Sequence, residues 1–154
     1  MQVRQPPQHD PAARELHDVD AAALYSRAVA ASKHAYAPYS AVRVGAALLT
    51  ADGSVITAGN VENSSYGLTI CAERAAIVCA LAGGHRRFAA IAVAVETDRV
   101  HTAVSCGACL QVLAEFDQEE TLLCIFRDGD SLRVSPLSEL MPIRFQLQTT
   151  PSPS

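Results

Sequence analysis

The sequence predicts an α/β fold, a three-layer α-β-α sandwich around a five-stranded mixed sheet. Segments with apolar residues at helical spacing alternate with short apolar runs of strand length, in the order α-β-β-α-β-α-β-β. The run FAAIAVAVE at residues 88–96 shows no polar alternation, as expected of a strand buried on both faces. With 154 residues and no sign of a repeat or a second domain, the chain is long enough to bury a core without disulfides.

The first third of the chain is predicted to form a helix followed by a β-hairpin. Residues 18–36 have the apolar spacing of a helix, and either Asp18 or Asp20 can serve as its N-cap. Residues 42–62 contain two strand-like stretches on either side of ADGS. Because an Asp-Gly pair is a strong signal for a tight turn, we expect these two strands to pair as a hairpin.

The middle of the chain is predicted to form a helix, a strand and a second helix. The first of these helices begins near Cys71, continues to about Leu81 and stops at Gly83-Gly84, since glycine is favoured just past a helix end. The buried strand at residues 88–96 follows it. The next helix covers residues 107–116 and begins within a cluster of two cysteines.

Two short strands are predicted in the last third, at residues 121–126 and 132–137, on either side of the turn RDGD. The last apolar piece, residues 137–145, is predicted to be a short helix or a turn. These elements complete the five strands of the predicted sheet.

A single domain is predicted at residues 16–146, between flexible, proline-containing polar tails at 1–15 and 147–154. Sixteen acidic and twelve basic residues give a net charge of −4 without a Lys/Arg-rich block, which argues against a long polynucleotide partner. No apolar run approaches the roughly 18–20 residues that cross a bilayer, and the first twenty residues lack the apolar core of a secretory signal. We therefore expect a cytoplasmic protein that binds neither nucleic acid nor membrane.

Five cysteines, an odd number in a chain expected to be cytoplasmic, favour metal binding or core packing over disulfides. Cys106 and Cys109 form a C-x-x-C pair, which alone could be a redox pair, half of a zinc site or two small core residues. The redox interpretation lacks the usual aromatic residue before the pair, and a zinc ribbon is excluded because no second C-x-x-C exists. Cys79 and Cys124 lie in the middle of a predicted helix and strand, where core packing is the better interpretation.

Cys71 makes a metal site the favoured interpretation. Cys71 and the Cys106/Cys109 pair each open a predicted helix, and neighbouring helices in parallel-type packing begin at one edge of the sheet, so the three sulfurs can converge. Helix N-termini carry a partial positive charge, which favours thiolates. Three thiolates suit Zn²⁺ and leave its fourth position open, as in catalytic sites rather than structural ones.

Glu73 lies in the first turn of the helix that Cys71 opens. A long carboxylate side chain at a helix end can reach a target beyond the first turn, where it could take a proton from water and return it to a leaving group. Arg74 is one turn from Cys71, and its positive charge can offset the surplus negative charge of three thiolates around one Zn²⁺. The five histidines have no spacing that completes this site, and His101, five residues before Cys106, is the nearest in sequence to the pair.

The segments NVENSSYGLTICAERAAIVCAL and SCGACLQVLAEF resemble the free-nucleoside cytidine deaminases, a family of small homotetrameric zinc enzymes. The deaminase signature is H-x-E…P-C-x-x-C, with three cysteines as the variant ligand set, and this sequence shows C-A-E…S-C-x-x-C. The similarity extends over residues 20–145. It implies a cytidine deaminase-like fold, one zinc ion per chain, and hydrolytic deamination of cytidine and 2′-deoxycytidine in pyrimidine salvage.

The resemblance also implies roles for the matching residues. Cys71, Cys106 and Cys109 would hold the zinc ion, and Glu73 would move protons between water, the ring nitrogen and the departing ammonia. Asn60 and Glu62 are implied to bind the ribose 3′-hydroxyl, and the backbone of Ala72 and Ser105 to meet the edge of the base. In a homotetramer, Ser64, Tyr66 and Phe145 would reach the pocket of a neighbouring subunit, where Phe145 would pack on the base. Without the resemblance, Asn60 and Glu62 would be interpreted as a turn at a strand end.

Three residues depart from the pattern of the family. Ser105 replaces the usual proline before the C-x-x-C pair and lacks its stiffness. Leu110 replaces a common arginine, which removes a positive charge near the thiolates or at a subunit contact. Val42 replaces a phenylalanine that packs against the base, so that the pocket could admit a bulkier cytosine or bind cytidine less tightly.

These departures leave two alternatives open. Val42 favours a deaminase of a modified cytosine nucleoside, such as the antibiotic blasticidin S. Ser105 and Leu110 suggest an inactive zinc-binding member that serves as a subunit or a binding protein. The intact Glu73 argues against inactivity, because a purely structural site has no use for a carboxylate aimed at an open position.

Overall fold

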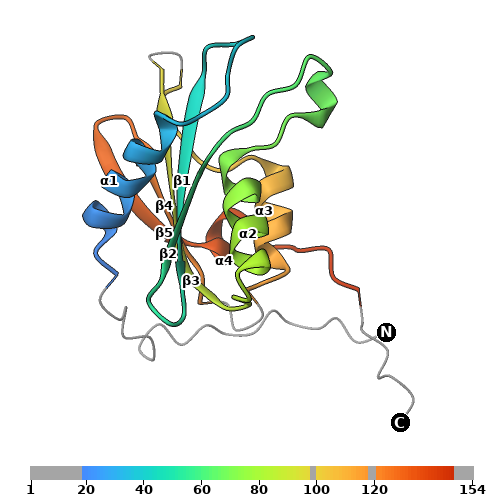
Figure 1. Ribbon diagram of the computed structural model, residues 1–154. Coiled ribbons are helices and arrows are strands. Elements are labelled where there is room, and N and C mark those ends of the chain that lie inside the picture. Colours follow the sequence, from blue (N-terminus) through green and yellow to red (C-terminus); the bar gives the residue numbers. More distant parts are fainter. Residues whose placement is uncertain (1–18, 98–99, 118–120, 148–154) are drawn as a thin grey trace, which may run out of the picture.

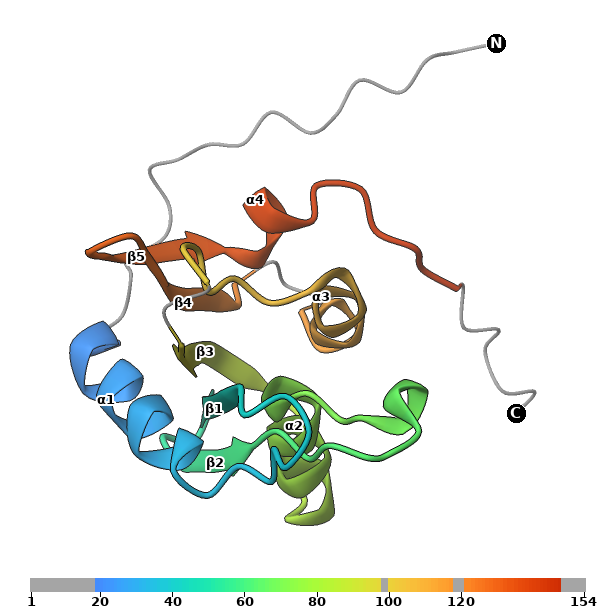
Figure 2. The ribbon, with the colours of Figure 1, turned by 90° about the horizontal axis from the view of Figure 1, so that it is seen from above.

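In a computed structural model, which describes residues 19–97, 100–117 and 121–147, the chain forms the predicted three-layer sandwich. A five-stranded mixed sheet with the strand order β2-β1-β3-β4-β5 is the middle layer. Helix α1 covers one face of the sheet, and helices α2 and α3 cover the other (Figures 1 and 2). The elements in chain order are α1 (Ala21–Ser32), β1 (Arg43–Thr50), β2 (Val55–Gly59), the 3-10 turn η1 (Tyr66–Leu68), α2 (Ala72–Ala82), β3 (Phe88–Glu96), α3 (Gly107–Ala114), β4 (Leu123–Asp128), β5 (Ser131–Pro136) and α4 (Leu137–Leu140).

Strand β3 is the central strand of the sheet and determines where the covering helices begin. It pairs antiparallel with β1 and parallel with β4. Helix α2 leads into the start of β3, and α3 follows its end, so that both helices begin at the edge of the sheet where β3 ends (Figure 1). The sequence predicted this common edge from the order of the elements.

Alternate residues of the strands face two separate apolar cores. The core below α2 and α3 contains larger side chains, among them Leu48, Ile91, Leu113 and Phe126. The core below α1 is lined mainly by small residues of β1 and β3, namely Ala47, Ala90, Ala92 and Ala94. Strand β3 contributes to both cores, as its continuous apolar run predicted.

Small residues line the second core because α1 lies very close to β1. A Cβ atom added to Gly45 would lie 2.0 Å from the carbonyl oxygen of Ala28 and 2.4 Å from the backbone nitrogen of Ser32. Real Cβ atoms do not approach backbone atoms so closely, so only glycine allows this packing.

Helix α1 begins after Asp20, whose carboxylate accepts a hydrogen bond from the Ala23 N–H at 2.9 Å, as predicted for one of the two candidate caps.

The element boundaries differ from the predicted ones by small amounts, and most at the C-terminal end. Helix α4 ends at Leu140, and residues 141–147 continue without regular structure, because Pro142 lacks the N–H that a continuing helix would need. Strand β4 begins at Leu123, two residues later than predicted. Asp18 and the predicted tails, apart from Leu147, lie outside the described residues, and the domain boundaries stay a prediction.

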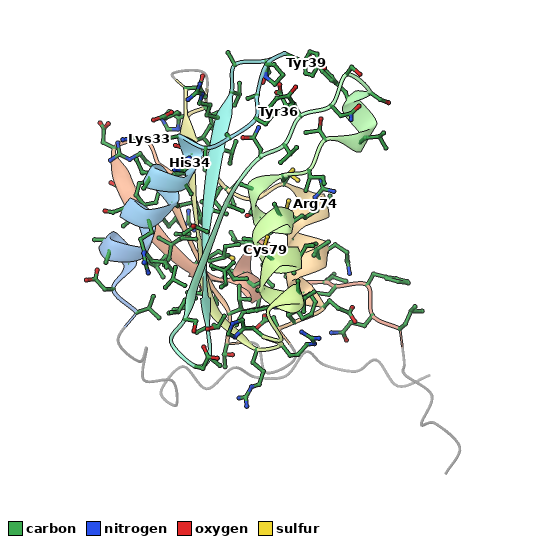
Figure 3. The ribbon with its side chains drawn as sticks, in the orientation of Figure 1. Lys33, His34, Tyr36, Tyr39, Arg74 and Cys79 are labelled. Atoms are coloured by element: carbon green, nitrogen blue, oxygen red, sulfur yellow. The ribbon has the colours of Figure 1, made fainter. Side chains whose placement is uncertain are left out.

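The two cysteines predicted to pack in the core behave differently. Cys124 is 3% exposed, as predicted, whereas the prediction for Cys79 is wrong because this residue is exposed on α2 (Figure 3). A position in the middle of a helix does not determine which face a residue occupies, and Cys79 lies beside the exposed Val78.

Within the described part of the chain, no helix has the length and apolar character needed to span a membrane.

Candidate metal centre

Three cysteine side chains come together where α2 and α3 begin. Cys71 is the N-cap of α2, Cys106 is the N-cap of α3, and Cys109 lies in the first turn of α3. Their sulfur atoms all lie within 4.8 Å of one another. In the ranges 19–97, 100–117 and 121–147, no other three His, Cys, Asp or Glu side chains gather in this way. The structure therefore brings together the three predicted ligands.

The backbone at both helix starts leaves the cysteine sulfurs free to bind a ligand. Cys71 (φ −67°, ψ 152°) and Cys106 (φ −69°, ψ 163°) have the extended conformation usual for an N-cap. Neither side chain makes the usual capping hydrogen bond to its own helix among the described residues. Cys109 is buried, Cys71 is half-buried and Cys106 is exposed, so the cluster is open to solvent on one side.

Cys71 and Cys109 do not lose their protons equally easily. A hydrogen bond with Cys109, helped by the nearby Arg74, lowers the pKa of Cys71 to about 5 although burial opposes the shift. The pKa of Cys109 is raised, first by its hydrogen bond with Cys71 and then by burial and the surrounding negative charge. Two adjacent thiolates repel one another, and a bound cation would remove that repulsion.

This donor set fits Zn²⁺. Thiolates are soft ligands that zinc favours, whereas Mg²⁺ and Ca²⁺ prefer oxygen atoms. Three converging sulfurs leave one position of a tetrahedral zinc ion open, and the solvent-exposed side of the cluster gives access to it. The helix N-termini beneath the sulfurs also stabilise their charged form. Cys71, Cys106 and Cys109 would therefore hold the ion.

Arg74 adds a positive charge to one side of the cluster. Its Nη2 atom lies 3.4 Å from Cys71 Sγ and donates a hydrogen bond of 3.0 Å to the carbonyl oxygen of Thr69. Figure 3 shows it at the end of α2 that carries Cys71. The contact with Cys71 raises the pKa of Arg74, so the guanidinium stays charged. Arg74 therefore both compensates thiolate charge and ties the chain before Cys71 to α2.

Glu73 is buried beside the cluster, in the first turn of α2, with only 4% of its surface exposed. Burial raises the pKa of its carboxyl group, and the negative charge of Cys71 adds to the effect. Hydrogen bonding from Ser105 opposes the shift. A buried carboxyl group that can exist with or without its proton next to an open metal position is suited to move protons there.

Asn60 and Glu62 lie just after β2, and both are buried, at 7% and 8% exposure. The side-chain amide of Asn60 accepts from Val44 N at 2.8 Å and donates to the Val42 carbonyl at 3.1 Å. Glu62 accepts a hydrogen bond of 2.8 Å from the Tyr39 N–H. Both side chains therefore hold the segment that leads into β1.

Ser40, which the sequence did not predict as a site residue, is central to this segment. Its hydroxyl binds the Glu62 carboxylate, and its Oγ accepts a hydrogen bond of 3.0 Å from the Val42 N–H. The next residue, Ala41, has a φ of 59°, a left-handed conformation that is uncommon outside glycine. Hydrogen bonding by Ser40 lowers the pKa of Glu62 and keeps it ionised. In the sequence, residues 37–40 (APYS) show no pattern that indicates these contacts.

The other residues singled out by the sequence fall into two groups. Ala72 and Ser105 are buried at the starts of α2 and α3, at 0% and 6% exposure, where their backbone could face a ligand. Tyr66 and Phe145 are 67% and 70% exposed, and Ser64 is exposed as well. The second group therefore remains available to contact another molecule.

Leu110 and Val42, two of the three residues that depart from the family pattern described above, are both partly buried. Leu110 packs against the core below α2 and α3, so this position contributes apolar contacts in place of a charge. Val42 lies in the segment held by Ser40 and Asn60. Neither substitution disturbs the convergence of the three sulfurs.

The chain is similar to known proteins along most of its length. Residues 19–125 match the family described as cytidine and deoxycytidylate deaminase zinc-binding region. A cytidine deaminase from Halalkalibacterium halodurans is 44% identical over 127 residues, which is 82% of this chain and 95% of that protein. One from Mycobacterium tuberculosis is 43% identical over 138 residues, 88% of this chain and 97% of that protein.

Two further similarities bear on the fold and the substrate. A crystal structure of cytidine deaminase from Burkholderia pseudomallei superposes with a TM-score of 0.73 at 47% identity, covering 80% of this chain and 98% of that one. A blasticidin-S deaminase from Bacillus cereus is 32% identical over 109 residues, 66% of this chain and 76% of that protein.

Proposed function

Since the chain belongs to the zinc-binding family of cytidine and deoxycytidylate deaminases, we propose that it hydrolyses cytidine and 2′-deoxycytidine to uridine and 2′-deoxyuridine with release of ammonia. It is then a hydrolase that acts on a C–N bond, with a place in pyrimidine salvage. The observation that carries this proposal is the convergence of Cys71, Cys106 and Cys109 beside the buried Glu73.

Each part of the site has a task in this reaction. A zinc ion held by the three cysteines would supply Lewis acidity, which lowers the pKa of water and makes it nucleophilic near neutral pH. The Glu73 carboxylate accepts a proton from the attacking water and delivers it to the ring nitrogen of cytosine. Glu73 then carries the water's second proton to the amino group, which leaves as ammonia. Its burial excludes bulk water that would compete for these protons.

The nucleoside is oriented by groups that the structure already holds in place. We assign the ribose 3′-hydroxyl to Asn60 and Glu62, whose side chains are fixed by the segment before β1. The backbone of Ala72 and Ser105 faces the edge of the base. Val42 lines the base, where its small side chain leaves more room than an aromatic ring.

We further propose that the enzyme is a cytoplasmic homotetramer in which each subunit completes a neighbour's pocket. The exposed Ser64, Tyr66 and Phe145 would reach the neighbouring site, with the Phe145 ring packed on the base. Tyr66 already makes an edge-on contact with Tyr39, with ring centroids 6.2 Å apart, so its ring is partly ordered before any association.

The test is the loss of ultraviolet absorbance when purified protein is mixed with cytidine or 2′-deoxycytidine, together with a zinc assay. Wild type is expected to bind about one zinc ion per chain and to release uridine and ammonia. Glu73→Ala should keep the zinc and lose turnover, and Glu139→Ala on α4 is the matched control, since it removes a carboxylate from a helix that carries none of the candidate site residues. A zinc-loaded wild type that deaminates no cytosine nucleoside would show an inactive, binding member of the family.

A second candidate substrate is a modified cytosine nucleoside. Val42 and the similarity to a blasticidin-S deaminase favour it. Blasticidin S is therefore included in the same assay. If its kcat/KM exceeds that of cytidine, the modified nucleoside is the substrate, and Val42→Phe should shift the preference back toward cytidine.

A further inference from the structure

The segment that follows α4 is firmly held although most of its side chains are exposed. Residues 141–147, which we call the C-terminal strap, run beside the C-terminal half of α3 (Figures 1 and 2). Ile143, Phe145 and Leu147 are 90%, 70% and 79% exposed. Between them, the side chain of Arg144 points inward and is only 8% exposed. The strap thus has an apolar outer side and a charged anchor.

The anchor is a buried ion pair between Arg144 and Asp117. Arg144 Nη2 lies 3.0 Å from Asp117 Oδ2, and the Asp117 side chain is fully buried. Among the described residues, neither of these two atoms has a further hydrogen-bond partner. Arg144 also donates from Nη1 to the Asp117 carbonyl at 3.1 Å, and Leu122 N donates to Asp117 Oδ1 at 2.8 Å. Each charge therefore depends on the other.

A second contact fixes the strap at the next residue. Gln111 of α3 donates from Nε2 to the carbonyl oxygen of Phe145 at 3.0 Å. The backbone of Phe145 is therefore held on α3 while its ring remains exposed. A buried ion pair contributes little net stability, because desolvation of the charges offsets their attraction, and its better-attested use is to select one conformation. Here the conformation selected is that of the strap.

We propose that Asp117 and Arg144 are positioning residues for Phe145, which hold the strap so that the exposed ring is ready to pack on a nucleoside in a neighbouring subunit. This inference rests on the role proposed above for Phe145. A ring whose backbone is already held in place loses less conformational freedom when substrate binds, so the Asp117–Arg144 pair, which we call the clamp, strengthens substrate binding. It leaves the chemical step unchanged, because no hydrogen bond or ion pair among the described residues joins Asp117 or Arg144 to Glu73 or to the three cysteines.

The kinetic test compares Phe145→Ala, the clamp variant Asp117→Asn/Arg144→Met, and the combination of all three substitutions. Removing both charges avoids an unpaired buried charge, and the asparagine keeps Oδ1 for the Leu122 N–H. Arg133→Met is the matched control, because it removes an exposed arginine that lies 3.7 Å from Asp128 at the β4–β5 turn.

Phe145→Ala is expected to raise the KM for cytidine about two- to tenfold, as the loss of one aromatic contact predicts, with kcat little changed. The clamp variant should give a similar rise, and adding Phe145→Ala to it should raise KM no further, since both act through one ring. Arg133→Met should leave KM unchanged. Additive effects, or an unchanged KM in the clamp variant, overturn the proposal.

A second measurement needs no enzyme activity. Trypsin should cleave after Arg144 slowly in the wild type, because that side chain is buried. In Asp117→Asn, which keeps the cleavage site, the fragment beginning at Phe145 should appear at least about tenfold faster, with cleavage after Arg133 as the internal reference. Equal rates overturn the clamp. If the strap is protected but Phe145→Ala leaves KM unchanged, the proposed role of Phe145 is wrong and the positioning role falls with it.

Discussion

Arg74 reaches the cysteine cluster from the first turn of α2 and brings a full positive charge to it. Its contact with Cys71 Sγ is 3.4 Å, and its Nε atom is buried without a hydrogen-bond partner among the described residues. Leaving a buried donor unpaired costs free energy. The placement is nevertheless favourable because three thiolates around one zinc ion would otherwise carry a surplus negative charge close to Glu73.

Replacing Arg74 with alanine is therefore expected to weaken zinc binding by about 10- to 100-fold, the range typical of residues that support metal ligands. Competition with a chromophoric chelator measures the affinity directly. The matched control is Arg86→Ala, since Arg86 donates to the carbonyl oxygen of Leu81 at the opposite end of the same helix. Equal zinc affinities of Arg74→Ala and wild type would show that the thiolate charge is balanced elsewhere.

The residues of the site differ in how far the sequence alone could identify them. Cys71, Cys106, Cys109 and Glu73 were predictable because helix starts and residue types define their chemistry locally. Ser40 was not, because its role depends on contact with Glu62, 22 residues away. The Asp117–Arg144 pair was missed for the same reason, since two charges 27 residues apart show no pattern until the strap is placed on α3.

At the scale of elements, the distance between α1 and the sheet is set by Gly45. The sequence predicted the strand but not this close approach, because a glycine within a strand can equally mark a bulge or a bend. Gly45→Ala is expected to destabilise the protein by at least about 1–3 kcal/mol, since its Cβ would meet backbone atoms of α1 that cannot move independently. Urea unfolding followed by circular dichroism measures the loss.

The control for this prediction is Gly67→Ala. A Cβ atom at Gly67 would meet no heavy atom within 4 Å, so the same chemical change there tests only the added methyl group. Its free energy of unfolding should stay within about 0.5 kcal/mol of that of the wild type, as for most surface substitutions. The prediction for Gly45 fails if the two variants unfold at the same urea concentration.

For the whole molecule, the order of elements was enough to predict three layers and a common edge for the starts of α2 and α3. It could not predict which surfaces are left uncovered. The exposed apolar side chains of the C-terminal strap, and Tyr66 and Leu68 at 67% each, lie outside both cores. Their exposure in one chain is consistent with the proposed homotetramer, in which they would be covered by neighbouring subunits.

Mixed assemblies test whether one subunit completes another's site. Chains with Glu73→Ala are expected to be inactive, and chains with Phe145→Ala to be active with a raised KM. The two chains are co-expressed with different affinity tags, so that mixed assemblies can be purified. In these assemblies every intact Glu73 belongs to a Phe145→Ala chain, and an intact Phe145 can reach it only from a neighbouring Glu73→Ala chain. If Phe145 serves a neighbour, these assemblies should regain a fraction of sites with the wild-type KM for cytidine. If Phe145 serves its own chain, every chain with Glu73 lacks the ring, so no site with the wild-type KM should appear.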